Sequence, residues 1–137
     1  MKSIIFAIIT AFIWGIVPVL EKLGLNKINP WVGLFYRCLG VSLGMVVLGL
    51  FFLKELKTVN PNKIAFLILG GLLASVIGQI FFHISLKASD VSKIVPIVGS
   101  YPLISFLLGI ILLGENLTLN KTVAIVLIIL GIWLISI

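Results

Sequence analysis

The sequence is poor in charged residues and in the residue types that build reactive or metal-binding sites. Only 10% of its 137 residues are charged, and it contains one cysteine and one histidine. One cysteine excludes a disulfide scaffold and a multi-cysteine metal site. The sequence also has no nucleophile–base arrangement and no nucleotide-binding loop. We therefore expect no catalytic residues, no metal ion and no cofactor.

Hydrophobic residues dominate instead, at 61% of the chain, against about 45–50% in a soluble globular domain. Small domains bury only about two-thirds of the surface that they could expose, so this composition excludes a water-soluble enzyme. The net charge is +6, but there is no basic run and no nucleic-acid-binding motif. In a membrane chain, lysines mark helix ends and the headgroup region, so we expect a lipid bilayer and no nucleic acid as partner.

Five apolar segments have about the 20 residues that a helix needs to cross a bilayer. The first lacks a small-x-small cleavage site, so we interpret it as a retained helix rather than a signal peptide. The sequence predicts an all-α integral membrane protein with one transmembrane domain over residues 1–137. Its predicted helices cover residues 3–23, 30–53, 61–86, 91–113 and 119–137.

Polar residues next to these segments predict where helices begin. Asn29 and Asn60 each precede a proline, which places an N-cap before a proline at the first helical position. Asp90 is expected to cap the fourth helix, and either Asn116 or Thr118 the fifth.

The positive charges divide evenly between the two membrane sides that five helices define. Each side carries five, so the bias that orients most membrane proteins is nearly absent. Either one or two early lysines still set a single orientation, or copies insert both ways and form an antiparallel pair. The two sets are Lys2, Lys54, Lys57, Lys63 and Lys121, against Lys22, Lys27, Arg37, Lys87 and Lys93.

Polar residues inside the predicted helices mark the candidate site, because such groups are costly in a bilayer. Glu21, Arg37, Gln79 and His83 fall in the same half of the membrane, with Arg37 about 10 Å deep at the standard helical rise. They suggest a polar cavity open to one side, with Glu21 and Arg37 as its charged gate or pair. The predicted cavity lining is Trp14, Gln79, His83, Tyr101 and Ser105.

Each of these residues also has a structural interpretation, which the sequence leaves open. Arg37 can snorkel to the surface instead of pairing with Glu21, and Glu21 can serve as an interfacial helix end. Gln79 can join two helices, and His83 can hydrogen-bond a neighbouring helix rather than exchange protons.

Three prolines lie inside predicted helices: Pro18, Pro96 and Pro102. Each removes a backbone hydrogen bond and tends to kink its helix. Bent helices near the midplane recur in transporters, where the freed carbonyls face a cavity. Three prolines inside helices exceed what packing alone requires, which is consistent with a transport protein.

A set of residues along the whole chain matches a known pattern. They are Trp14–Gly15, Pro18, Lys22, Arg37, Leu86–Ser89, Pro96, Tyr101–Pro102, Leu113–Thr118 and Gly131–Ile132. Together they resemble one EamA-type repeat of the drug/metabolite transporter superfamily. The small multidrug-resistance branch is less similar, because residues 11–15 lack the acidic residue that it carries in the middle of its first helix.

The resemblance implies a fold and a function. Common family members resemble two such five-helix repeats in tandem, inverted around a central cavity, whereas this chain holds one. The expected function is a secondary transporter that exports a small polar or amphiphilic metabolite by alternating access. We expect an antiparallel homodimer, or a homologous half-transporter as partner, in the cell membrane of a prokaryote. Alternatives are half of a heteromeric lipid-sugar flippase and a non-transporting subunit of another complex.

Overall fold

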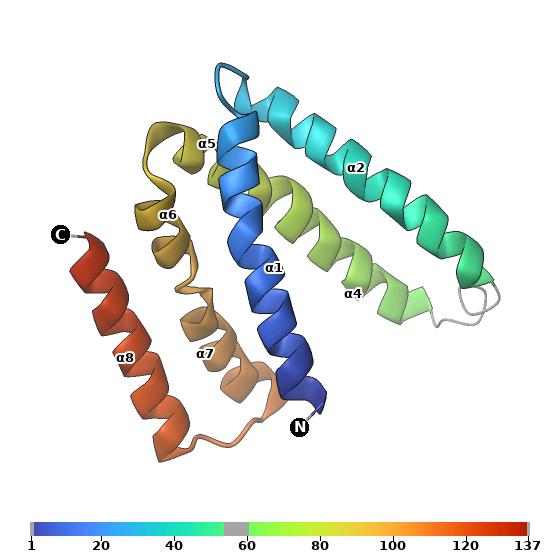
Figure 1. Ribbon diagram of the computed structural model, residues 1–137. Coiled ribbons are helices and arrows are strands. Elements are labelled where there is room, and N and C mark those ends of the chain that lie inside the picture. The colour runs from blue at the N-terminus through green and yellow to red at the C-terminus, as the bar shows by residue number, and fades with distance from the viewer. Residues whose placement is uncertain (1, 54–60, 137) are drawn as a thin grey trace. The chain divides into compact units, whose positions relative to one another are not determined.

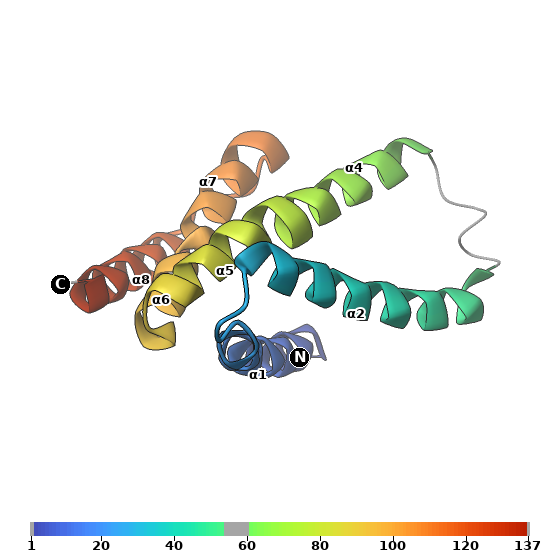
Figure 2. The same cartoon turned by 90° about the horizontal axis from the view of Figure 1, so that it is seen from above.

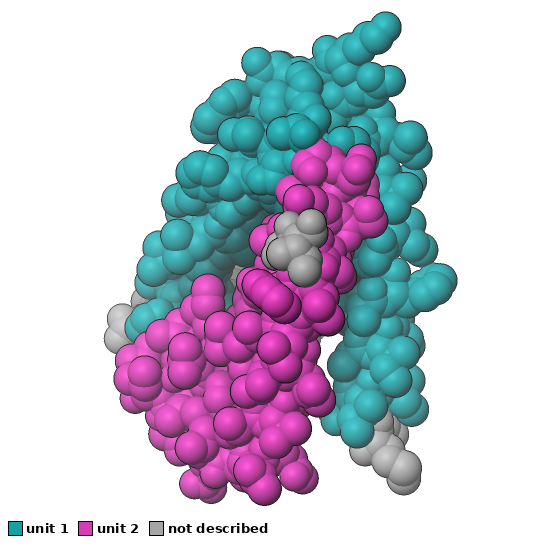
Figure 3. Space-filling model, turned by 90° about the vertical axis from the view of Figure 1, so that its left-hand side faces the viewer, with its two compact units in different colours: residues 1–88 teal, residues 89–137 magenta. Residues whose placement is uncertain are grey.

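The computed structural model describes residues 2–53 and 61–136, and all regular structure in these two ranges is helical (Figure 1). The chain divides into two compact units, Met1–Ala88 and Ser89–Ile137, which Figure 3 colours separately.

Three apolar spans make up the first unit. The third span is a single rod in which a π-helical segment, η1, joins α4 to α5. Helix α5 contacts both α1 and α2, and the start of α2 reaches it in both views (Figures 1 and 2). The elements are α1 (Lys2–Gly24), α2 (Pro30–Phe51), α4 (Pro61–Leu72), η1 (Leu73–Gly78) and α5 (Gln79–Ala88).

The second unit contains α6 (Val91–Val98), α7 (Tyr101–Leu113) and α8 (Leu119–Ser136). The sequence predicts one helix over residues 91–113, but the structure breaks it at Gly99 and Ser100. Pro102 explains the break, because it has no N–H to continue the helix and its ring clashes with the carbonyl one turn earlier. Pro102 thus lies in the first turn of α7, while Pro96 stays inside α6.

The predicted helix caps differ in the bonds that they make. The Asn29 side chain accepts a hydrogen bond from the Trp31 amide at 2.9 Å. Asp90 occupies the N-cap of α6 without a side-chain cap bond. At α8 the capping group is the Thr118 hydroxyl, 3.4 Å from the Lys121 amide. Asn60 lies outside the described residues.

Glu115 follows the end of α7 in a turn that only glycine adopts without strain. Gly114 has φ +66°, and the Glu115 amide donates to the Gly109 carbonyl at 3.1 Å, which satisfies a carbonyl of the last helical turns. The Glu115 carboxylate lies 3.5 Å from the Lys121 ammonium. These contacts tie the α7–α8 connection to both of its helices.

The helix surfaces in both units are apolar. Four described segments are long and apolar enough to cross a membrane: Ser3–Gly24, Pro30–Phe51, Lys63–Ala88 and Val91–Leu113. A fifth apolar helix, Leu119–Ile135, is shorter. Large hydrophobic side chains are exposed along all of them, which requires lipid rather than water around them. The prediction of an all-α integral membrane protein is confirmed.

Candidate functional site

The buried part of the first unit lies where α1, α2 and α5 meet. Its buried hydrophobic side chains include Leu34 from α2 and Ile80 and Leu86 from α5. Among them lies one buried polar residue, His83, with a relative exposure of 2%. A buried polar ring in the middle of the packed region makes this junction a candidate site.

The Glu21 carboxylate lies at the centre of this junction. Its Oε1 accepts a hydrogen bond from Arg37 Nε at 2.9 Å, and the Gln79 amide donates to Oε1 at 2.9 Å and to Oε2 at 3.0 Å. His83 Nε2 lies 3.5 Å from Oε1. We call these four residues the Glu21 cluster. Three separate helices supply them, so the cluster joins α1, α2 and α5.

Helical spacing and a glycine position these side chains. Gln79 and His83 are four residues apart and therefore share one face of α5. Gly33 lets α2 approach closely, since a Cβ there would lie 2.5 Å from the Leu25 Cδ2 and 3.6 Å from His83 Nδ1. A Cβ at position 33 would require the buried Leu25 side chain to shift.

The π-helical segment η1 ends immediately before Gln79. A π-helix is wider than an α-helix, and single π turns occur often at functional sites. The Ser75 carbonyl in this segment accepts a hydrogen bond from Cys38 Sγ of α2, at 3.8 Å. The segment is thus anchored to α2, and it sets the rotation with which Gln79 enters the cluster.

The cluster leaves several polar atoms unsatisfied. Arg37 Nη1 and both ring nitrogens of His83 are buried and have no hydrogen-bond partner in the part of the chain that the structure describes. A buried donor or acceptor without a partner costs about 1–3 kcal/mol. Such atoms in a native structure call for an explanation beyond packing, and an external polar group can provide it.

The predicted site residues Trp14 and Pro18 of α1 do not belong to the Glu21 cluster. Trp14 lies on α1 with a relative exposure of 63%. Pro18 is buried one turn before Glu21. Tyr101 and Ser105 are exposed positions of α7, which belongs to the second unit.

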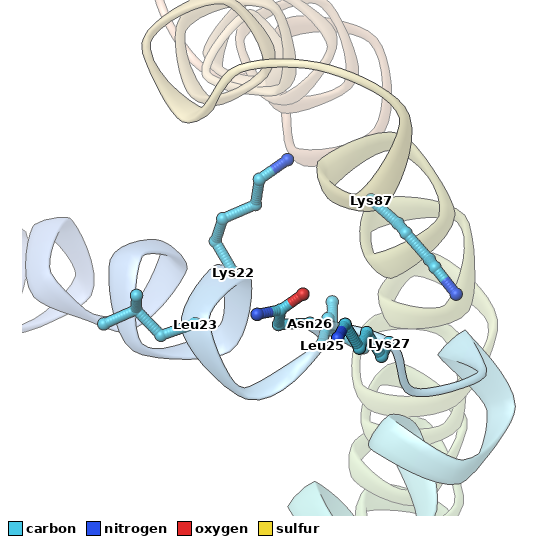
Figure 4. Close-up of a pocket in the computed structure, with 6 residues that line it drawn as sticks. All are labelled: Lys22, Leu23, Leu25, Asn26, Lys27 and Lys87. Atoms are coloured by element: carbon cyan, nitrogen blue, oxygen red, sulfur yellow. The ribbon is translucent and has the colours of Figure 1, made fainter.

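A second polar feature lies at the end of α1, where the sequence suggested only a helix end. It is an open recess of about 380 Å³. Lys22 donates to the Leu86 carbonyl, and Lys87 Nζ donates to the Ile28 carbonyl at 2.7 Å. We call it the lysine recess, lined by Lys22, Leu23, Leu25, Asn26, Lys27 and Lys87 (Figure 4).

The sequence profile of the EamA-like transporter family matches residues 1–137. The chain belongs to this family. This EamA-like chain is 23% identical over 135 residues to an uncharacterized transporter of Archaeoglobus fulgidus. The match covers 98% of the chain and 48% of that protein, so the chain spans about half the length of the curated relative. No solved structure matches it.

Family membership and the apolar helices together establish the class of the protein. This EamA-like chain is a multi-pass membrane protein, and its family is one of transporters rather than enzymes. The Glu21 cluster is the candidate site within it.

Proposed function

We propose that the protein is a secondary transporter that exports a small polar or amphiphilic metabolite, with the Glu21 cluster as its charged gate. The observation that carries the proposal is the set of buried, unsatisfied nitrogens of Arg37 and His83 around a carboxylate that three helices share. Their lost hydrogen bonds can be regained when a substrate or a rearranged cluster offers an acceptor.

The available donors define the chemistry of the substrate. Arg37 Nη1 is a permanent hydrogen-bond donor, because a guanidinium has donors only. It would bind an acceptor such as a carboxylate, carbonyl or hydroxyl oxygen. A substrate favours one of two conformations only if it binds the two with different affinities. Movement of the Arg37–Glu21 pair between the conformations would provide this difference in affinity.

We infer that the transporting form is an antiparallel homodimer. The predicted topology of five helices places five positive charges on each side of the membrane, which suits insertion in both orientations. A second, inverted copy would then pack against the first. Trp14, Tyr101 and Ser105 would line the cavity of that dimer, and Pro18, Pro96 and Pro102 would allow its helices to bend. A prokaryotic cell membrane is the proposed location.

Transport in proteoliposomes tests the role of the Glu21 cluster. Amino acids, organic cations, sugars and drugs are screened first for those that raise the unfolding temperature, because a ligand of the folded state stabilises it. Flux of each hit is then compared between the wild type and the variants Gln79→Ala and Arg37→Ala. We expect a loss of at least tenfold with folded protein retained.

Ser85→Ala is the matched control for these variants. Ser85 lies on α5 like Gln79, but its hydroxyl bonds the Phe81 carbonyl of its own helix at 2.9 Å. Unchanged flux in Gln79→Ala and Arg37→Ala would remove the Glu21 cluster from the transport path.

The topology of the C-terminus tests the dimer. Two reporters, each active on one membrane face, are fused to residue 137. Comparable activity of both supports dual insertion and the antiparallel homodimer. Activity of one reporter alone contradicts the antiparallel homodimer and requires either a parallel assembly or a separate inverted partner, as in a heteromeric flippase.

A further inference from the structure

We propose that the lysine recess binds the phosphate headgroup of an anionic phospholipid. This inference concerns the lipid around the protein and goes beyond transport. It rests on the charge of the recess, on the backbone conformation of one of its lysines, and on the apolar and aromatic residues beside it.

The residues that line the recess carry positive charge. Three of the six are lysines, and no acidic side chain is among them. Glu21, next to Lys22 in sequence, already accepts hydrogen bonds from Arg37 and Gln79. A volume of about 380 Å³ falls within the range of small-molecule sites, roughly 300–1,000 Å³. The recess can therefore hold a phosphate group near several ammonium groups.

Bonds to backbone carbonyls account for two of these lysines: Lys22 binds the last turn of α5, and Lys87 binds the α1–α2 loop. The ammonium groups of Lys22 and Lys87 donate to the carbonyls of Leu86 and Ile28, which hold the α1–α2 loop against the end of α5. Lysines commonly bind carbonyls at helix C-termini. These bonds also hold the two side chains in place beside the recess. Lys22 comes from α1 and Lys87 from α5 (Figure 4).

Lys27 is the third lysine of the recess, and no bond to a backbone carbonyl explains its presence there. Its side chain is exposed and makes no hydrogen bond or ion pair within residues 2–53 and 61–136. Its φ of +61° is costly for a residue with a Cβ, and glycine or asparagine would hold the same turn with less strain. Strained residues cluster at ligand sites. A ligand anion beside the ammonium group gives this lysine a role.

The surroundings of the recess favour a lipid over a soluble anion. Leu23, in its lining, has a relative exposure of 70%, and Trp31, in the first turn of α2, has 63%. Exposed tryptophan at a helix end is typical of the membrane interface. These exposures would place the recess at the boundary between headgroups and acyl chains, where basic pockets between transmembrane helices bind anionic headgroups.

The test uses the purified full chain in detergent and measures its unfolding temperature by tryptophan fluorescence. Short-chain phosphatidylglycerol, phosphatidylcholine with the same acyl chains, and inorganic phosphate are titrated separately. Lys27→Gln is compared with Lys63→Gln, which removes the same charge from the opposite end of the Lys63–Ala88 span. Lys87→Gln is a second variant. For it, the shift in unfolding temperature with phosphatidylglycerol is divided by the shift with phosphatidylcholine, and this ratio is compared with that of the wild type.

We expect phosphatidylglycerol alone to raise the unfolding temperature of the wild type and of Lys63→Gln. Lys27→Gln and Lys87→Gln should need about fivefold more of this lipid for the same shift, the effect of about one lysine near an anionic surface. Three results would overturn the proposal: an equal response to phosphatidylcholine, a full response to inorganic phosphate, or equal midpoints for Lys27→Gln and Lys63→Gln. None of them bears on transport by the Glu21 cluster.

Discussion

Arg37 Nε lies 2.9 Å from Glu21 Oε1, so a guanidinium in the second apolar span pairs with a carboxylate near the end of the first. Their side chains have relative exposures of 29% and 11%, which places the pair between buried and interfacial. Gln79 supplies two further hydrogen bonds to the same carboxylate. The Glu21 carboxylate is thus paired with a cation from α2 and hydrogen-bonded by a neutral amide from α5.

Replacing one member of this pair should destabilise the protein more than replacing both. Glu21→Gln leaves the Arg37 guanidinium without a counter-ion, while Glu21→Gln with Arg37→Gln removes both charges. We expect a coupling free energy of about 1–3 kcal/mol, below the value for a fully buried pair because Arg37 is partly exposed. Thermal or denaturant unfolding in one detergent measures this coupling on four proteins: the wild type, Glu21→Gln, Arg37→Gln and the double variant. A coupling near zero would show that the pair does not stabilise the fold.

His83→Leu should separate stability from transport. Both ring nitrogens of His83 are buried without hydrogen-bond partners among the described residues, so an apolar replacement removes an unsatisfied group. The unfolding temperature should stay equal or rise, while flux falls at least tenfold. The same proteoliposomes serve both measurements. A destabilised His83→Leu protein with normal flux would instead assign the histidine a structural role.

Two glycines of α2 should respond in opposite directions to alanine. A Cβ at Gly33 would lie 2.5 Å from Cδ2 of Leu25, which is itself buried. Gly33→Ala should therefore cost about 1–3 kcal/mol of unfolding free energy. A Cβ at Gly40 would meet no neighbouring atom within 4 Å, so Gly40→Ala should be neutral or stabilise by up to about 1 kcal/mol. Equal effects would contradict the close approach of α2 at Gly33.

Lys27→Gly should stabilise the fold while weakening the lysine recess. Glycine adopts a φ of +61° without strain, which should raise the unfolding free energy by about 1 kcal/mol in the absence of anionic lipid. Unfolding with and without phosphatidylglycerol measures both effects. Lys63→Gly is not a suitable control, because glycine within a helix is destabilising. Lys27→Asn is the control instead, since asparagine also adopts a positive φ and also removes the lysine charge. A lower unfolding temperature of Lys27→Gly in lipid-free detergent would contradict the assigned strain.

Much of the fold followed from local sequence signals. The apolar spans and the asparagine before Pro30 identified the helices, because hydrophobic length and capping depend on residues close in sequence. The break in the fourth span was less visible. Pro102 was expected to bend a continuous helix, and the structure begins a new helix there after Gly99 and Ser100.

The candidate site was only partly accessible from the sequence. Depth in the membrane indicated that Glu21, Arg37, Gln79 and His83 share one half of the bilayer, but the sequence left open whether Arg37 pairs or snorkels. The structure shows the pair with Glu21. The lysine recess was missed, since lysines at helix ends usually indicate only the membrane boundary.

The membrane class, the position of the spans and the family can all be inferred from the amino-acid sequence. Hydrophobic composition and motif residues act through each residue's own chemistry and its near neighbours. Which polar groups meet depends on the packing of the helices. Gln79 and Glu21 are 58 positions apart, and Lys22 and Leu86 are 64 apart. Their contacts depend on how far each helix is rotated and how closely it approaches, which Gly33 and the π-helical turn before Gln79 determine.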